Sequence, residues 1–257
     1  MPALHNVRKI VCACLFAALL VSIAGTALTG CGSSSQGNRA YLEELEQRSV
    51  DDAQKLIYER ADEKKRAALE EAASDGFVEA EANRKIFGDC VLIGDSVSYM
   101  AYEAGYLTED EICGYYSVSL KTCDNYVDKA IALRPSRIVF NFGTNDMVLF
   151  GGDAGDFAET YLEQCEKIKA ELPYCEIYIA STLSPNAEAL EDNPGMVYAD
   201  AFNAAVSEMC GKTDRVTYVD TSALVDEHAD LRGDDGIHFK DDFYGYWFAV
   251  VDKAIYA

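Results

Sequence analysis

Residues 89–257 alternate between two kinds of segment, and this alternation is the feature that most restricts the fold. Short runs rich in β-branched and other apolar residues are separated by longer segments with helical spacing of apolar residues. Such alternation is typical of a parallel sheet with helices on both faces. We therefore expect an α/β fold, a three-layer α/β/α sandwich around a mainly parallel sheet of about five strands. The expected strands are 90–93, 137–142, 176–181 and 216–219, with a weaker one at 115–119.

The helices expected between these strands follow from the spacing of the apolar residues. The first begins after Ser96, and the next two each end beside a proline, which cannot continue a helix. In sheets of this kind ligands bind at the carboxyl ends of the strands, so residues directly after a strand are candidates for chemistry. The later expected helices are 122–133, 157–172, 198–210 and 243–256.

The first expected strand breaks into Gly94-Asp95-Ser96. A glycine allows a sharp backbone turn, and a helix that starts there points its free N–H groups at the turn. Ser96 would present its hydroxyl at that point, which suits a nucleophile. Serine is also a common helix N-cap, so this block alone is equally compatible with a structural role.

Two later blocks offer the partners that a nucleophilic serine needs. In Gly143-Thr144-Asn145-Asp146, the Asn145 amide could donate to a tetrahedral oxyanion, although Asn and Asp also build ordinary turns. In Asp235-Gly236-Ile237-His238, the spacing on a helical turn would let Asp235 orient one imidazole nitrogen and leave the other basic. A surface or core histidine is the alternative for His238, whereas His228 lies in an acidic stretch typical of solvated residues.

The three blocks, in this order, resemble the SGNH (GDSL-type) hydrolase family, and the resemblance covers roughly residue 89 to the C-terminus. It implies that Ser96 is the nucleophile, His238 the base and Asp235 the residue that orients the base. It also implies an oxyanion hole formed by the Ser96 N–H, Asn145 and a backbone N–H from a further block, where the family usually has glycine. Ser117 is the best match there, with Gly114 as the alternative.

The Asp-Gly-Ile-His block followed by an aromatic helix most resembles extracytoplasmic members of this family that act on cell-envelope sugars. The resemblance implies an esterase that removes acyl groups, in particular O-acetyl groups, from a glycan or a small ester, without a metal or other cofactor. An O-acyltransferase would use the same residues. A catalytically silent module that only binds glycan or a partner is the alternative from another class, and the presence of all four site residues argues against it.

The first 31 residues have the pattern of an export signal. Arg8 and Lys9 precede an apolar stretch that ends in Leu28-Thr29-Gly30-Cys31, which resembles a bacterial lipoprotein cleavage site. The resemblance implies a diacylglycerol on Cys31 and a protein anchored at the extracytoplasmic face of the cell membrane; a membrane-spanning anchor is the alternative. The expected organisation is a signal peptide (1–30), a tether (31–39), a helical spacer (40–86) and a catalytic domain (87–257).

Charge and cysteine content limit the partners and the redox chemistry. A net charge of −22 should repel nucleic acid and anionic headgroups, so we expect no nucleic-acid partner. Oligomeric state is not indicated by the sequence. Six cysteines remain after the signal and Cys31, and in an exported protein they could form three disulfides in any of 15 pairings or pack as free thiols. They are Cys90, Cys113, Cys123, Cys165, Cys175 and Cys210.

Replacing Cys31 tests the anchor. Without the thiol no diacylglycerol can be attached, so the Cys31→Ser protein should leave the membrane fraction or keep its signal peptide. Fractionation and the intact mass of the purified chain measure both outcomes. Unchanged processing and membrane association in this variant would contradict lipidation.

Overall fold

The computed structural model describes residues 50–73 and 75–257. The expected signal peptide, the tether with Cys31 and residues 40–49 of the expected spacer lie outside these residues. The chain divides into two compact units, Met1–Ala61 and Asp62–Ala257. The described part of the first unit is the beginning of helix α3 (Val50–Ala72), and the second unit contains the sheet. Across the described ranges, no helix is long and apolar enough to cross a membrane.

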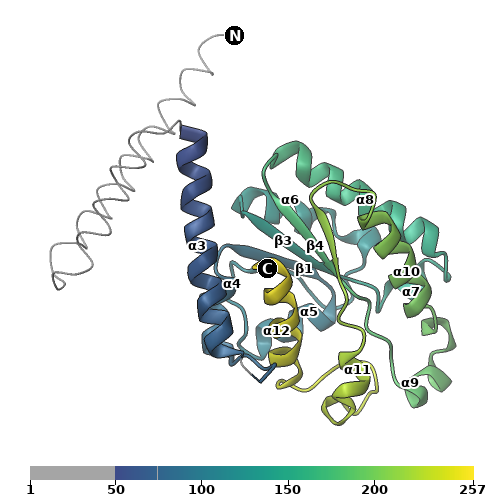
Figure 1. Cartoon of the computed structure of the whole chain (residues 1–257). Helices are drawn as coiled ribbons and strands as arrows, with labels where there is room; N and C mark the ends of the chain where they lie inside the picture. The colour runs from purple at the N-terminus through teal and green to yellow at the C-terminus, as the bar shows by residue number, and fades with distance from the viewer. Residues whose placement is uncertain (1–49, 74) are drawn as a thin grey trace. The chain divides into compact units, whose positions relative to one another are not determined.

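The sheet has five strands, all parallel, in the order β2-β1-β3-β4-β5 (Figure 1). The expected α/β/α fold and strand number are therefore confirmed. This order places β1 and β3 in the centre, where each is buried along its whole length. The strands are β1 (Cys90–Gly94), β2 (Ile112–Gly114), β3 (Arg137–Asn141), β4 (Glu176–Ala180) and β5 (Val216–Val219).

The weaker strand expected at 115–119 is wrong, because the edge strand β2 precedes it. Ile112 and Cys113 are buried, whereas Tyr115 and Tyr116 are exposed. Ser117 has a φ of +59°, a left-handed conformation that strands do not adopt. The segment is therefore a loop at the carboxyl end of β2.

The helices lie close to their expected positions. Those that cover the sheet are α4 (Ala80–Phe87), α5 (Ser96–Glu103), α6 (Asp124–Leu133), α8 (Ala154–Glu171), α10 (Ala199–Cys210) and α12 (Phe243–Ile255). Shorter helices at the strand-to-helix connections are α7 (Asp146–Leu149), α9 (Ala187–Asp192) and α11 (Leu224–Glu227), with 3₁₀ turns at Leu120–Thr122, Pro194–Met196 and Ala229–Leu231. Pro135 and Pro173 follow the ends of α6 and α8, as the sequence predicts.

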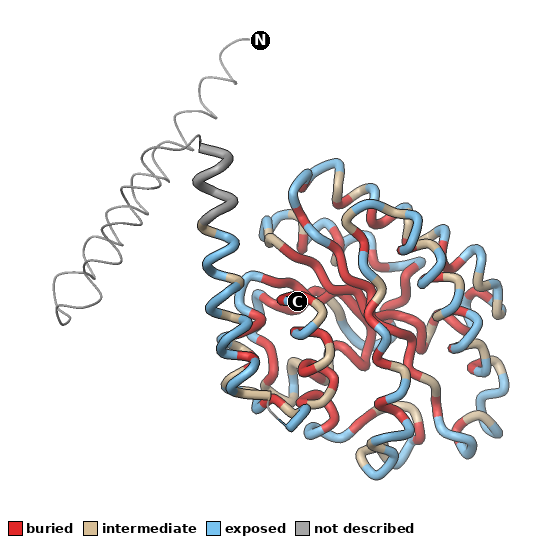
Figure 2. The backbone as a smooth tube through the Cα atoms, in the orientation of Figure 1, coloured by how far each residue is buried: buried red, intermediate tan, exposed pale blue. Residues whose placement is uncertain are grey.

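Alternate residues of the central strands face two separate apolar layers. Figure 1 shows helices on both faces of the sheet, and Figure 2 shows its strands coloured as buried. Val91 and Ile93 of β1 pack with α6, α8 and α10, and Leu92 packs with α4, α5 and α12. Ile138 and Val139 of β3 divide in the same way. Because both faces of the sheet are buried, the sequences of these strands are continuous apolar runs rather than alternating apolar and polar residues.

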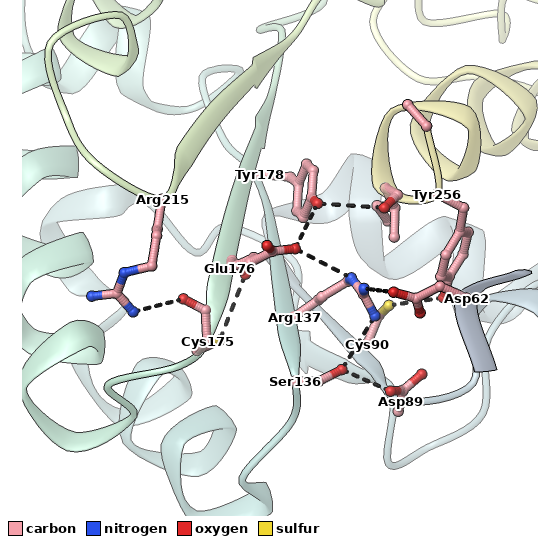
Figure 3. Close-up of polar contacts among 12 residues, drawn as sticks. Asp62, Asp89, Cys90, Ser136, Arg137, Cys175, Glu176, Tyr178, Arg215 and Tyr256 are labelled. Carbon is pink, nitrogen blue, oxygen red and sulfur yellow. Dashed lines mark hydrogen bonds and ion pairs between the residues drawn. The ribbon is translucent and has the colours of Figure 1, made fainter. Parts of the chain in front are cut away.

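The amino end of the sheet carries an almost buried arginine (Figure 3). Arg137 begins β3, and its Nη2 donates to Asp62 Oδ2 of α3 at 2.5 Å, while its Nε lies 3.6 Å from Glu176 Oε2. Burial alone would lower the pKa of Arg137, but the hydrogen bond and charge of Asp62 outweigh it and raise the pKa. The pair attaches this part of α3 to the sheet.

Further contacts join α3, α4 and the C-terminus. The Tyr256 hydroxyl donates to the Ile86 carbonyl at 2.9 Å and accepts from Lys65 Nζ at 3.0 Å. Leu69 of α3 is also buried in the layer that contains α12. Residues 62–73 and 75–86 of the expected spacer thus belong to the unit that contains the sheet. The division of the whole chain into spacer and catalytic domain stays a prediction.

The six cysteines under consideration are all buried and none forms a disulfide in the described residues. Burial raises the pKa of Cys90, Cys123, Cys175 and Cys210 to about 12, and that of Cys113 to about 11. They are therefore protonated at neutral pH and pack as small apolar side chains. The sequence allowed either disulfides or free thiols, and in the structure these six cysteines are free thiols.

A buried acid in α12 makes stability depend on pH. Asp252 is fully buried, neither of its carboxyl oxygens has a hydrogen-bond partner, and burial raises its pKa well above the usual range. Folded protein therefore keeps this proton at pH values where the unfolded chain, with a pKa of about 4, has lost it. It follows that this group lowers the free energy of unfolding as the pH rises above about 4.

Asp252→Asn should remove this pH dependence, because the amide is similar in shape and does not ionise. In urea unfolding, the stability of the variant relative to the wild type should increase by on the order of 1 kcal/mol per pH unit above about pH 4. Asp110→Asn, at an exposed position, is the control for the exchange of aspartate for asparagine itself. A difference for Asp252→Asn that stays constant with pH would contradict a neutral buried Asp252.

Candidate active site

Ser96 lies at the carboxyl end of the central strand β1, as the first residue of α5. The N-cap of α5 is Asp95, whose Oδ1 accepts from the Val97 N–H at 3.0 Å. Ser96 is therefore not used as the cap, and its hydroxyl is available for another partner. A Cβ atom at Gly94 would come within 2.4 Å of the Asn141 carbonyl oxygen, so only glycine fits directly before this turn.

The partner of the Ser96 hydroxyl is His238. The Ser96 Oγ and His238 Nε2 atoms are 2.8 Å apart, and His238 Nδ1 is 2.6 Å from Asp235 Oδ2. The three side chains, expected to act together from the sequence, thus form one hydrogen-bonded series. Ser96 is 5% exposed, and the His238 side chain is 26% exposed, so the series is partly shielded but reachable from solvent.

Asp235 is held by a loop and not by the helical turn that the spacing predicts. Its Oδ1 accepts from the backbone N–H groups of Ile237 and His238, both at 2.9 Å. Gly236 between them has a φ of +69°, which favours glycine. A bridge between Arg232 and Phe239 closes the loop. The i,i+3 spacing still brings the Asp235 and His238 side chains together, because the Asp235 carboxylate closes the turn by hydrogen bonds from the backbone.

Asp235 is strongly biased toward its charged form. Partial burial raises its pKa, but hydrogen bonds from the His238 ring and the two backbone N–H groups outweigh burial and lower the pKa to about 2. The carboxylate therefore favours the His238 tautomer with its proton on Nδ1. That tautomer leaves Nε2 with a lone pair toward the Ser96 hydroxyl, as a general base requires.

Asn145 and the loop after β2 are in contact at the same end of the sheet as this series. Asn145 Nδ2 donates to the Val118 carbonyl at 2.9 Å, and one of its two N–H bonds remains for another acceptor. Ser117 precedes Val118 and has the left-handed backbone typical of glycine, which fits the position where the resembling family usually has one. The left-handed backbone of Ser117 and the hydrogen bond from Asn145 to the neighbouring Val118 favour the Ser117 N–H as the oxyanion donor. This role of Ser117 stays a prediction.

Gly114, the alternative donor, has a clear packing role. A Cβ atom there would lie 2.2 Å from the Gly94 carbonyl oxygen of the neighbouring strand. The two glycines are also register partners in the sheet. Gly114 thus allows β1 and β2 to approach at the end that carries Ser96.

Two buried carboxyl groups behind the site were given no role by the sequence analysis. Asp146 follows Asn145, is fully buried, and accepts from the Leu120 N–H at 2.8 Å, which ties the start of α7 to the loop after β2. Burial raises the pKa of Asp146 to about 7, and burial together with the charge of Asp146 raises that of Asp95 to about 7. Their place next to Ser96 and Asn145 in the sequence blocks is the signal that could have identified them.

His228 is not part of the site. It was expected to be solvated, but its ring is half-buried and stacks on Tyr246 with the ring centroids 3.6 Å apart. No group of three or more His, Cys, Asp or Glu side chains within residues 50–73 and 75–257 could hold a metal ion.

A hydrogen-bonded serine, histidine and aspartate at the carboxyl end of a parallel α/β/α sheet is an arrangement suited to nucleophilic acyl transfer. The chain belongs to the GDSL-like lipase/acylhydrolase family, whose sequence profile matches residues 93–245, more than half of the chain. It is therefore an ester hydrolase of the GDSL, or SGNH, type.

Solved structures share the fold at low sequence identity. A lipase/acylhydrolase from Enterococcus faecalis is 14% identical with a TM-score of 0.51, and the match covers 65% of this chain and 95% of that one. A GDSL-like lipase from Bacteroides thetaiotaomicron is 16% identical with a TM-score of 0.50, over 65% and 86% of the two chains. An acetyl esterase mutant crystallised with acetate is 15% identical with a TM-score of 0.52, over 65% and 95%. The comparison with curated protein sequences finds no significant match.

Substitutions test the hydrogen-bonded series. His238→Ala should reduce the turnover of 4-nitrophenyl acetate by on the order of 10⁴, because it removes the base that lies 2.8 Å from the Ser96 hydroxyl. Asp235→Asn should also impair turnover, since the amide lacks the charge that favours the correct tautomer. Initial rates and circular dichroism on the same samples measure activity and folding.

His228→Ala is the matched control, because it removes a second imidazole that lies outside the series. Its turnover should stay close to that of the wild type. Equal losses for His228→Ala and His238→Ala in folded protein would contradict the assignment.

Proposed function

We propose that this protein is an exported serine esterase that removes acyl groups, in particular O-acetyl groups, from a glycan of the cell envelope or a similar glycan. The observation that carries the proposal is the contact of 2.8 Å between Ser96 Oγ and His238 Nε2, with Asp235 bound to the other ring nitrogen. The acetyl preference is supported by the resemblance of the Asp-Gly-Ile-His block and by the fold shared with an acetyl esterase.

The geometry accounts for a two-step acyl transfer. Ser96 Oγ attacks the ester carbonyl while His238 Nε2 takes its proton, and Asp235 stabilises the imidazolium. The Ser96 N–H, the Asn145 amide and the Ser117 N–H would hold the oxyanion. His238 then returns the proton to the leaving sugar oxygen, which forms the acyl-serine. Water, activated by His238, hydrolyses the acyl-serine and releases the carboxylic acid.

The cellular site of action is part of the proposal. The pattern of residues 8–31 supports export and a lipid on Cys31, which would leave the catalytic domain at the extracytoplasmic face. The net charge of −22 favours uncharged substrates over polyanions. Esters on neutral sugars therefore fit the chain better than anionic lipids or nucleic acids.

The preference for short acyl groups can be measured directly. The full chain in mild detergent should hydrolyse 4-nitrophenyl acetate with a kcat/KM at least about tenfold higher than that for 4-nitrophenyl palmitate, as expected if several unaccommodated methylenes each cost binding energy.

A fluorophosphonate should add its mass to Ser96 alone, and the Ser96→Ala protein should neither react nor hydrolyse.

Three results would overturn this proposal. Labelling of a residue other than Ser96 would remove the nucleophile, and a preference for palmitate would exclude a deacetylase. Acetyl transfer to an added sugar that exceeds release of acetate, measured by mass spectrometry of the products, would identify an acyltransferase instead.

A further inference from the structure

Four tyrosines form an aromatic cluster on the surface of the catalytic unit. Tyr99 and Tyr102 belong to α5, and Tyr115 and Tyr116 to the loop after β2; we call these four residues the tyrosine cluster. Ring centroids of Tyr99 lie 4.8 Å from Tyr115, 5.3 Å from Tyr116 and 5.5 Å from Tyr102. Tyr115 is 50% exposed and Tyr116 40% exposed. Grouped aromatic surface in contact with water often marks a binding site.

The tyrosine cluster adjoins the proposed reaction centre through both of its elements. Tyr99 follows Ser96 by three residues in α5, so both side chains lie on one side of the helix. Tyr115 and Tyr116 directly precede Ser117, and Asn145 holds the same loop through Val118. A group bound on the tyrosine cluster would therefore be next to an ester carbonyl attacked by Ser96.

Polar groups at the cluster favour a sugar over an acyl chain. The Tyr116 hydroxyl donates to the Glu103 carboxylate, and this bond, with partial burial, raises the pKa of Tyr116 to about 12, so the hydroxyl keeps its proton at neutral pH. A pyranose has a C–H face that packs on an aromatic ring and hydroxyls at its rim that need donors and acceptors. A hydrocarbon chain would leave Glu103 and the phenol oxygens beside apolar surface, at a cost in desolvation.

The negative charge of the protein at and around the tyrosine cluster favours neutral glycans over anionic ones. Glu103 lies at the tyrosine cluster, and the chain as a whole carries 22 more acidic than basic residues. An anionic sugar would be repelled, whereas an uncharged one would not. We propose that the tyrosine cluster is a binding subsite for an uncharged pyranose ring of the glycan whose ester is attacked by Ser96. The proposal rests on the esterase function proposed above and specifies its substrate as a neutral glycan.

The subsite has a kinetic consequence. Binding of a sugar ring away from the reacting carbonyl places the ester against Ser96, so it raises kcat/KM for a glycan ester and not for an ester without a sugar. The ratio of the two kcat/KM values is therefore the quantity that reports the subsite. Ethyl acetate is a suitable sugar-free substrate because it has no ring that could stack on tyrosine.

The test measures acid release by the full chain in detergent from O-acetylated cellohexaose, O-acetylated chitohexaose and ethyl acetate. For the wild type, at least one acetylated hexasaccharide should exceed ethyl acetate in kcat/KM. In a Tyr115→Leu/Tyr116→Leu double variant this ratio should fall about tenfold or more, mainly through KM for the sugar. The corresponding Phe/Phe variant should keep most of the ratio, because the rings remain. Tyr174→Leu, which replaces a tyrosine that is 87% exposed outside the cluster, should keep the wild-type ratio.

The outcomes separate the subsite from the esterase function. No hydrolysis of any ester by the wild type would refute the proposed function itself. Hydrolysis of ethyl acetate without preference for either acetylated hexasaccharide would overturn the subsite alone. Equal losses on glycan and ethyl acetate in the Leu/Leu variant would show that the tyrosines only support the loop. Retention of the ratio by Leu/Leu would exclude ring stacking. An O-acetylated oligogalacturonide, measured in the same assay as an anionic comparison, would exclude a neutral ligand if its kcat/KM exceeded those of both neutral hexasaccharides.

Discussion

The close approach of backbones at the carboxyl end of β1 is the constraint on which the site depends. Gly94 lies between the Asn141 carbonyl of β3 and Gly114 of β2, and a Cβ atom at either glycine would come within 2.4 Å of a neighbouring carbonyl oxygen. A Cβ atom at Gly94 would also come within 2.1 Å of Ser98 Oγ in α5, so glycine allows the chain to turn and α5 to begin directly after β1. That turn places Ser96 at the helix N-terminus, while Asp95 takes over the capping bond.

The site combines one charged carboxylate with two buried carboxyl groups whose pKa values are raised. Asp235 has its pKa lowered to about 2 by bonds from His238 and the backbone, so it can stabilise an imidazolium. Asp95 and Asp146, with pKa values raised to about 7, lie beside Ser96 and Asn145 in the chain. Asp95 caps α5, and Asp146 holds the loop after β2 through the Leu120 N–H.

The amino end of the sheet carries stabilising contacts, and the carboxyl end carries the site. At the amino end, Arg137 pairs with Asp62 (Figure 3), and Tyr256 near the C-terminus donates to the Ile86 carbonyl of α4. At the carboxyl end, loops and short helices carry the groups suited to chemistry and the tyrosine cluster. This division follows from parallel strands, since all their carboxyl ends meet at one edge where helix N-termini and loops can converge.

The sequence by itself determined the fold class, most strands and helices, and the residues of the hydrogen-bonded series. Local signals were sufficient there: apolar runs buried on both faces, prolines after α6 and α8, and polar blocks directly after strands. It misplaced the edge strand, because Tyr115-Tyr116-Ser117-Val118 has strand propensity and only the pairing of Gly114 with Gly94 ends β2 earlier. Only the tertiary structure decided that the cysteines are free, that Leu69 of α3 and Ile86 of α4 pack in the layer with α12, and that the tyrosines of α5 meet those of the loop after β2. Each of these depends on contacts between residues far apart in the chain, whose geometry no local pattern records.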